Sequence, residues 1–101
     1  MIHVLAIITT KPGMRDAVLK EFRANVPNVH AEKGCVEYGP ATDADGFSAG
    51  AKLGTDTFVV IEKWESMEAL KAHAAAPHMA AYAAKTRDMI ASRTIHVLSP
   101  A

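Results

Sequence analysis

Hydrophobic positions along the chain recur with two different periods, and these periods predict strands in some segments and helices in others. Residues 2–10 form a short run rich in β-branched types, and residues 57–65 alternate strictly, so both are predicted strands. Apolar residues recur with helical spacing from Met14 until Lys33-Gly34 ends the pattern, which predicts the first helix. Pro27 lies inside this pattern and is expected to kink the helix or loosen its last turn.

A second strand is predicted at 35–42, and Pro40 indicates that this strand bends or lies at an edge of its sheet. Residues 43–56 follow it, contain three glycines and show no clear period. Segments of this length without a pattern are uncommon in small domains, and we expect a long, mobile hairpin loop here.

The last third of the chain predicts a broken helix and a closing strand. Ser66 is a favourable N-cap for a helix that extends to about Ala76. Pro77 is then well placed to begin a second helical segment, because proline is tolerated at the first helical position. We expect this alanine-rich segment to cover 77–92 and the last strand to cover 93–98.

This order of elements predicts a single α+β domain over residues 1–101. It is the ferredoxin-like βαββαβ plan, in which a four-stranded antiparallel sheet carries its helices on one face.

The strands place apolar residues on both faces of the predicted sheet. Leu5 and Ile7 lie opposite the other apolar residues of the first strand, and Val59 and Ile61 do the same in the third. Helices can cover only one face, so the other face needs a partner, and the simplest partner is a second copy of the chain. We therefore expect a homodimer formed through the sheet face.

Composition excludes several classes of function. Eleven Lys and Arg balance eleven Asp and Glu, and a neutral chain without a basic stripe is a poor nucleic-acid binder. No apolar run reaches the ~18 residues of a membrane span. We see no secretory signal, and the one cysteine cannot form an internal disulfide. We therefore expect a cytoplasmic protein that binds neither nucleic acid nor membranes.

Four segments together resemble a known family: Lys33-Gly34-Cys35-Val36-Glu37-Tyr38, Phe58-Val59-Val60-Ile61-Glu62-Lys63-Trp64, Glu68-Ala69-Leu70-Lys71-Ala72-His73 and Pro77-His78-Met79. They resemble the antibiotic biosynthesis monooxygenase domain family, and in particular its quinol monooxygenase members. The resemblance implies a dimeric α+β barrel with a pocket between sheet and helices in each subunit. It also implies oxidation of a hydroquinone or polyphenol by O2 without flavin, haem or metal, with electrons supplied by the substrate.

The chain departs from two other branches of that family. Haem-degrading members carry an axial histidine where this chain has Ala83, and a second tryptophan where it has His73. Members that oxidise polyketides have an asparagine at the position of Val60 and a tyrosine at that of Leu70. The quinol-oxidising branch is therefore the better match.

Three residues are the main candidates for chemistry. His73 is the predicted catalytic base, since histidine titrates near neutral pH, although it could instead tie its helix to a strand carboxylate. Trp64 is expected to form an aromatic wall of the site or to anchor the core. Glu62 lies on an apolar strand face, so it should pair with a histidine, an arginine or the Trp64 N–H.

His78, Tyr82 and Tyr38 complete the predicted substrate-binding set. His78 follows Pro77 and would line the pocket mouth or cap the helix, and Tyr82 shares its helix face. Either tyrosine could donate to a substrate oxygen or simply pack. We predict no metal site, because no cysteine or carboxylate pattern completes one.

Two other functions remain open at this point. The chain could be a small-molecule-binding or stress-response dimer with no enzymatic activity. It could also be an isomerase of a small metabolite, in which Arg87 or a lysine of the 43–56 loop would contact an anionic group.

Overall fold

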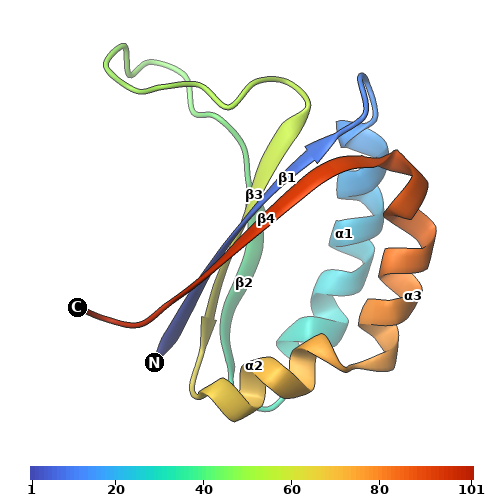
Figure 1. The fold of residues 1–101 in the computed structure, drawn as a ribbon, viewed down its shortest axis with the longest axis vertical. Helices are drawn as coiled ribbons and strands as arrows, with labels where there is room; N and C mark the ends of the chain where they lie inside the picture. Colours follow the sequence, from blue (N-terminus) through green and yellow to red (C-terminus); the bar gives the residue numbers. More distant parts are fainter.

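The structure, a computed structural model that describes all 101 residues, is a four-stranded sheet with helices on one face (Figure 1). This is the expected ferredoxin-like α+β fold. The elements follow in the order β1 (Ile2–Thr10), α1 (Arg15–His30), β2 (Cys35–Ala41), β3 (Thr57–Trp64), α2 (Met67–Ala74), α3 (Pro77–Thr86), a 3-10 turn (Arg87–Met89) and β4 (Ile90–Leu98).

The strands pair in the order β2-β3-β1-β4, and all three pairings are antiparallel. β2 is therefore an edge strand, as Pro40 predicted. In the centre of the sheet, Val4 lies between Glu62 of β3 and Val97 of β4. Residues paired across strands share a face, so the buried Val4 places Glu62 on the face that the helices cover.

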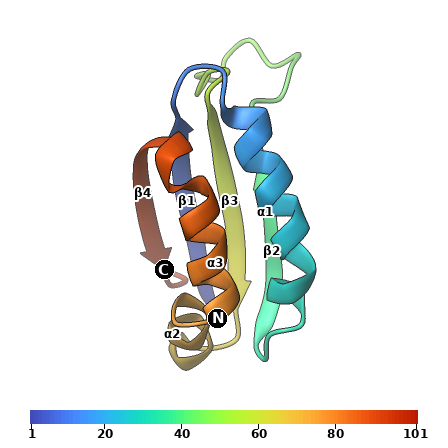
Figure 2. The ribbon, with the colours of Figure 1, turned by 90° about the vertical axis from the view of Figure 1, so that its right-hand side faces the viewer.

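α1 and α3 lie side by side over this face, and α2 lies at the end of the sheet where β3 stops (Figure 2). The core between sheet and helices contains four fully enclosed large side chains, Val18, Val29, Phe58 and Trp64. Two come from α1 and two from β3, so α1 is fastened directly to the strand that carries Glu62 and Trp64. None of the helices is long and apolar enough to cross a membrane.

The predicted helix starts are confirmed, but one helix end was wrong. The Ser66 side chain accepts a hydrogen bond from the Ala69 N–H, and Pro77 begins α3. The helix expected over 77–92 ends at Thr86, and β4 begins at Ile90 rather than at residue 93. β1 extends to Thr10 and pairs there with Ile90, so sheet pairing overrides the local helical pattern. α1 continues through Pro27 to His30.

The opposite face of the sheet carries no helix, and apolar side chains lie open on it. Leu5 and Ile61 are each 38% exposed and Leu98 is 44% exposed. The hairpin loop between β2 and β3, residues 42–56, contains no helix or strand and extends beyond the end of the sheet opposite α2 (Figure 1).

The turn between α1 and β2 requires glycine at residue 34. Gly34 has φ +86°, in the left-handed region that glycine adopts without strain. A Cβ built at this residue would lie 2.6 Å from the Ala69 Cβ, because the turn packs against the first turn of α2. The Gly34 carbonyl also accepts a hydrogen bond from the Glu65 N–H, at 2.8 Å, which ties this turn to the end of β3.

We expect Gly34→Ala to lower the free energy of unfolding by about 2 kcal/mol or more, through left-handed strain and overpacking. Urea unfolding followed by circular dichroism measures this difference. Gly39→Ala is the matched control, because its Cβ would meet no atom within 4 Å and its φ is not positive. Equal stability of the two variants would contradict the close packing of this turn.

Candidate functional site

A cavity of about 580 Å³ lies between the helix-covered face of the sheet and the helices α2 and α3. Hydrophobic residues make up 17 of its 21 lining residues, so it suits an apolar ring rather than a sugar or a phosphate. Four of the six predicted site residues line it: Tyr38, Glu62, His73 and Tyr82. The structure places the other two, Trp64 and His78, outside its wall.

His73 lies in the last turn of α2 and is buried. Its Nδ1 lies 2.8 Å from the Glu32 Oε2, and a carboxylate can only accept, so the imidazole N–H donates. The ring packs against Trp64 at 4.6 Å and edge-on against Tyr38 at 5.4 Å between ring centroids. The His73 Nε2 bonds no protein group, and it is not fully enclosed. Because His73 lines the cavity, Nε2 is the nitrogen available to a ligand there.

Glu62 and Trp64, two residues apart on the same face of β3, form a buried hydrogen bond. The Trp64 Nε1–H donates to the Glu62 Oε1 at 2.9 Å, so Trp64 is the partner among the three kinds that the apolar strand face predicted. Burial raises the pKa of the Glu62 carboxyl, and the Trp64 hydrogen bond and nearby His73 offset part of that rise. No protein group bonds the second carboxyl oxygen, which leaves it available to a ligand in the cavity.

The raised pKa of Glu62 predicts how stability changes with pH. The folded state keeps the Glu62 proton to a higher pH than the unfolded state does. The contribution of Glu62 to the free energy of unfolding therefore falls as the pH rises from the unfolded pKa through the raised pKa of the folded state. Glu62→Gln retains an oxygen for the Trp64 N–H and removes the charge. We expect the free energy of unfolding of this variant, relative to that of wild type, to increase as the pH is raised from 4 to 8. Urea unfolding at each pH measures this difference.

Glu37→Gln is the control for that comparison, because Glu37 forms an exposed ion pair with Lys63 at 3.5 Å. The stability difference between this variant and wild type should stay nearly constant over the same pH range. A Glu62→Gln variant that behaves like the control would show that Glu62 ionises normally in the fold.

Two tyrosines contribute to the wall of the cavity. Tyr38 comes from β2 and Tyr82 from α3, and the Phe22 ring lies between them, at 5.2 Å from one ring and 6.0 Å from the other. The Tyr38 hydroxyl has no hydrogen-bond partner in the protein, and the Thr86 side chain is the one group that can bond the Tyr82 hydroxyl. Burial raises the pKa of Tyr38 far above its usual range and that of Tyr82 to about 12, so both remain donors at neutral pH.

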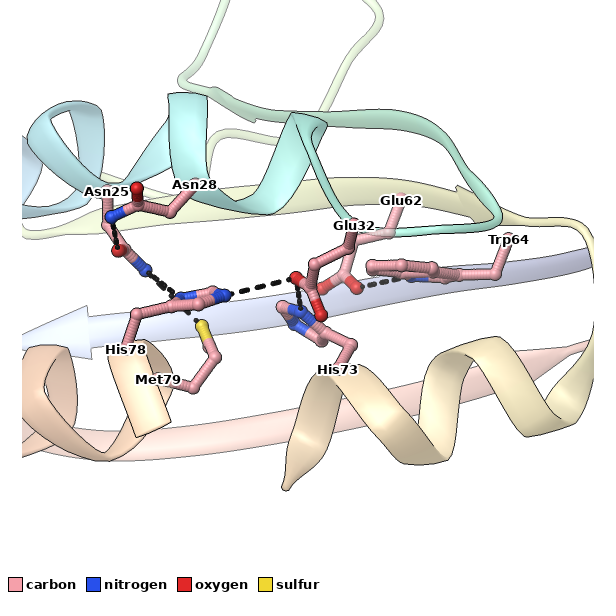
Figure 3. A network of polar contacts seen from close by, with 8 residues as sticks. All are labelled: Asn25, Asn28, Glu32, Glu62, Trp64, His73, His78 and Met79. Carbon is pink, nitrogen blue, oxygen red and sulfur yellow. Dashed lines mark hydrogen bonds and ion pairs between the residues drawn. The ribbon is translucent and has the colours of Figure 1, made fainter. Parts of the chain in front are cut away.

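Residues that the sequence did not single out connect His73 to His78 (Figure 3). Glu32, in the turn after α1, lies between the two imidazoles, and Asn25 of α1 contacts the far side of His78. Trp64 lies behind His73, fully buried, where it holds Glu62. The cavity is therefore backed by a second layer of polar groups that do not line it.

One physical signal in the sequence could have indicated Glu32. The residue follows the C-terminus of α1, where the helix dipole disfavours negative charge, so a carboxylate there needs another partner. The Lys33-Gly34 pair itself predicts only the end of the helix. Nothing local marks Asn25, since an asparagine on a helix surface is common.

A second cavity, of about 550 Å³, adjoins the first around Tyr82. It is lined by Arg87 and Arg93, and Arg93 and Tyr82 also line the first cavity. Arg87 is thus near the site, whereas Lys52 of the hairpin loop forms an ion pair with Asp45. No cluster of three or more His, Cys, Asp or Glu side chains could hold a metal ion.

The fold and the cavity together define a class of protein. A ferredoxin-like domain whose sheet and helices line an apolar cavity with one histidine and two tyrosines is suited to a small aromatic compound. The sequence model of the family described as "Antibiotic biosynthesis monooxygenase" matches residues 1–85. The chain therefore belongs to this family.

Individual relatives agree with that assignment. The "Probable quinol monooxygenase YgiN" of Escherichia coli K12 is 38% identical over 102 residues, which cover 99% of this chain and 98% of that protein. PA3566 from Pseudomonas aeruginosa superposes with a TM-score of 0.82 at 26% identity, over 99% of this chain and 93% of that one. Rv0793 from Mycobacterium tuberculosis superposes with a TM-score of 0.81 at 27% identity, over 99% of this chain and 94% of that one. The similarity thus extends over the whole fold.

Proposed function

We propose that the chain is a monooxygenase that oxidises a hydroquinone or related polyphenol with O2 in the 580 Å³ cavity, without flavin, haem or metal. The observation that carries this proposal is the meeting of an unpartnered imidazole nitrogen, an unpartnered carboxyl oxygen and two tyrosines in one apolar cavity. The name of the Escherichia coli relative, "Probable quinol monooxygenase YgiN", supports the same substrate class.

In this proposal each lining residue has a distinct role. His73 Nε2 accepts the proton of a substrate hydroxyl, which makes the ring electron-rich enough to reduce O2. Tyr38 and Tyr82 donate hydrogen bonds to the substrate oxygens, and the apolar walls exclude water from the reacting anion. Glu62 holds the ring in place through its free oxygen. Trp64 acts indirectly, through its hydrogen bond to Glu62, and His78 acts from outside the cavity.

The reaction balances with the substrate as the only electron donor. The deprotonated ring passes one electron to O2, and the two radicals combine to form a C–O bond. The O–O bond then breaks, one oxygen atom stays in the product quinone, and the other leaves as water with protons returned through His73. A hydroquinone and O2 thus give a hydroxyquinone and water, and all four electrons come from the ring.

Oxygen consumption by the chelator-treated protein tests this function. We expect uptake above the uncatalysed rate for at least one member of a panel of hydroquinones and naphthohydroquinones, with one quinone formed per O2. Tight binding without uptake would instead favour the non-enzymatic binding dimer. Uptake that depends on an added flavin or metal would contradict the proposal.

We also propose that two chains associate through the open sheet face. The exposed Leu5, Ile61 and Leu98 lie on this face. Burial of about 800 Å² per chain, at ~25 cal/mol per Å², makes a large gross contribution to the free energy of association. Light scattering should give twice the 10.8 kDa chain mass, and Ile61→Lys should lower it to that of one chain. Phe47→Lys, in the hairpin loop, is the control that should leave the dimer intact. A monomeric wild type would contradict this assembly.

A further inference from the structure

Glu32 presents one carboxylate oxygen to two imidazoles (Figure 3). Its Oε2 lies 2.8 Å from the His73 Nδ1 and 3.4 Å from the His78 Nε2, and the second contact lacks hydrogen-bond geometry. The carboxylate does not line the cavity, so any effect on a ligand there must pass through His73. The backbone fixes its place, because the Glu32 N–H donates to the Val29 carbonyl and its carbonyl accepts from the Cys35 N–H.

Two asparagines of α1 determine which nitrogen of His78 carries a proton. The Asn28 Nδ2 donates to the Asn25 Oδ1 at 3.0 Å, which directs the Asn25 Nδ2 toward the His78 Nδ1 at 3.1 Å. Because an amide nitrogen can only donate, the His78 Nδ1 must accept, and a neutral ring then carries its proton on Nε2. Both imidazoles therefore present an N–H to Glu32.

We propose that Glu32 is the positioning residue of His73 in the proposed oxidation. The inference rests on the proposed function for its kinetic part. Glu32 holds the proton of His73 on Nδ1, which leaves Nε2 as an acceptor in the cavity. The carboxylate then balances the positive charge that forms when Nε2 takes a proton, as the C-terminal end of α2 also does.

The proton transfer itself can be written with its electrons. The substrate O–H bond breaks, its electron pair stays on the substrate oxygen, and a new N–H bond forms at His73 Nε2. Glu32 exchanges no proton in this step and remains the acceptor of the His73 Nδ1–H. The proton later leaves Nε2 for the reduced oxygen that departs as water.

Two variants of Glu32 separate its charge from its hydrogen bond. Glu32→Gln keeps the volume and an acceptor oxygen but removes the charge, and we expect kcat to fall on the order of 10- to 100-fold with little change in KM. Glu32→Asp should restore part of the loss. Glu37→Gln, which alters an exposed carboxylate on β2, should leave both constants unchanged.

Nitrogen-15 NMR of the histidine rings tests the same proposal without turnover. In wild type with a neutral His73 ring, the proton should reside on Nδ1, and in Glu32→Ala this preference should be lost. A Glu32→Ala protein whose His73 still carries its proton on Nδ1 would overturn the proposal, and so would a Glu32→Gln enzyme with kcat within twofold of wild type. If the wild type shows no oxygen uptake, the proposed function fails, but the NMR result still decides the role of Glu32.

Discussion

Replacing His73 with glutamine is expected to lower kcat/KM for hydroquinone oxidation about 10²- to 10³-fold, within the usual range for losing a general base. Glutamine can keep a hydrogen bond to Glu32 and fill similar space at the end of α2, but it cannot take a proton at neutral pH. The loss should therefore come from the chemical step, while binding of the substrate changes little. Steady-state oxygen uptake and anaerobic binding of the same hydroquinone measure the two effects separately.

His96→Gln provides the control for that experiment. His96 is exposed on β4 and pairs with Leu5, on the face of the sheet that the cavity does not use. Because two chains are proposed to associate through this face, light scattering should first show that the variant keeps the wild-type mass. This variant should retain wild-type oxygen uptake. A His73→Gln enzyme with activity within threefold of wild type would show that another group removes the substrate proton, and Glu62 would then be the next candidate because its free oxygen reaches the same cavity.

Replacing Trp64 with alanine is expected to lower the free energy of unfolding by about 3–5 kcal/mol, the usual cost of deleting a large buried aromatic side chain. The ring is fully buried, it packs against His73, and its N–H is the one protein partner of the Glu62 carboxyl. Loss of the indole would leave both a void and a buried carboxyl without its hydrogen bond. Urea unfolding followed by circular dichroism measures the change.

Trp64→Phe separates these two contributions, since it keeps most of the ring and removes only the N–H. We expect it to cost about 1–3 kcal/mol, the penalty for a buried acceptor left without its donor. Phe47→Ala is the control, because Phe47 is 72% exposed and its removal should change stability little. A loss below about 1 kcal/mol for Trp64→Ala would contradict the tight packing of the indole behind His73.

Strand alternation made most of the fold predictable. The alternation of β3 assigned Phe58, Val60, Glu62 and Trp64 to one face, and all four are buried beneath the helices. The start of β4 was not predictable, because residues near Ile90 continue a helical pattern in the sequence. Only the pairing of Ile90 with Thr10, eighty positions earlier in the chain, shows that this segment belongs to the sheet.

The candidate site was predictable where its chemistry is local. Glu62 and Trp64 are two residues apart on one strand, so the strand period places them on the same face and makes the Trp64 N–H one of the partners expected for Glu62. The contact between Glu32 and His73 joins residues 41 positions apart, and no local pattern distinguishes the partners. The sequence predicts that His78 lines the pocket mouth or caps the helix. Its ring instead lies outside the cavity wall, makes no cap hydrogen bond and contacts Asn25 of α1.

Oxidation of a hydroquinone under ¹⁸O2 by the metal-free protein tests the central claim most directly, because it follows the fate of each oxygen atom. The account predicts one labelled oxygen atom in each molecule of product quinone, one in water, and loss of this labelling in His73→Gln. Formation of the unlabelled quinone with release of hydrogen peroxide, or no reaction above the rate without protein, would contradict it.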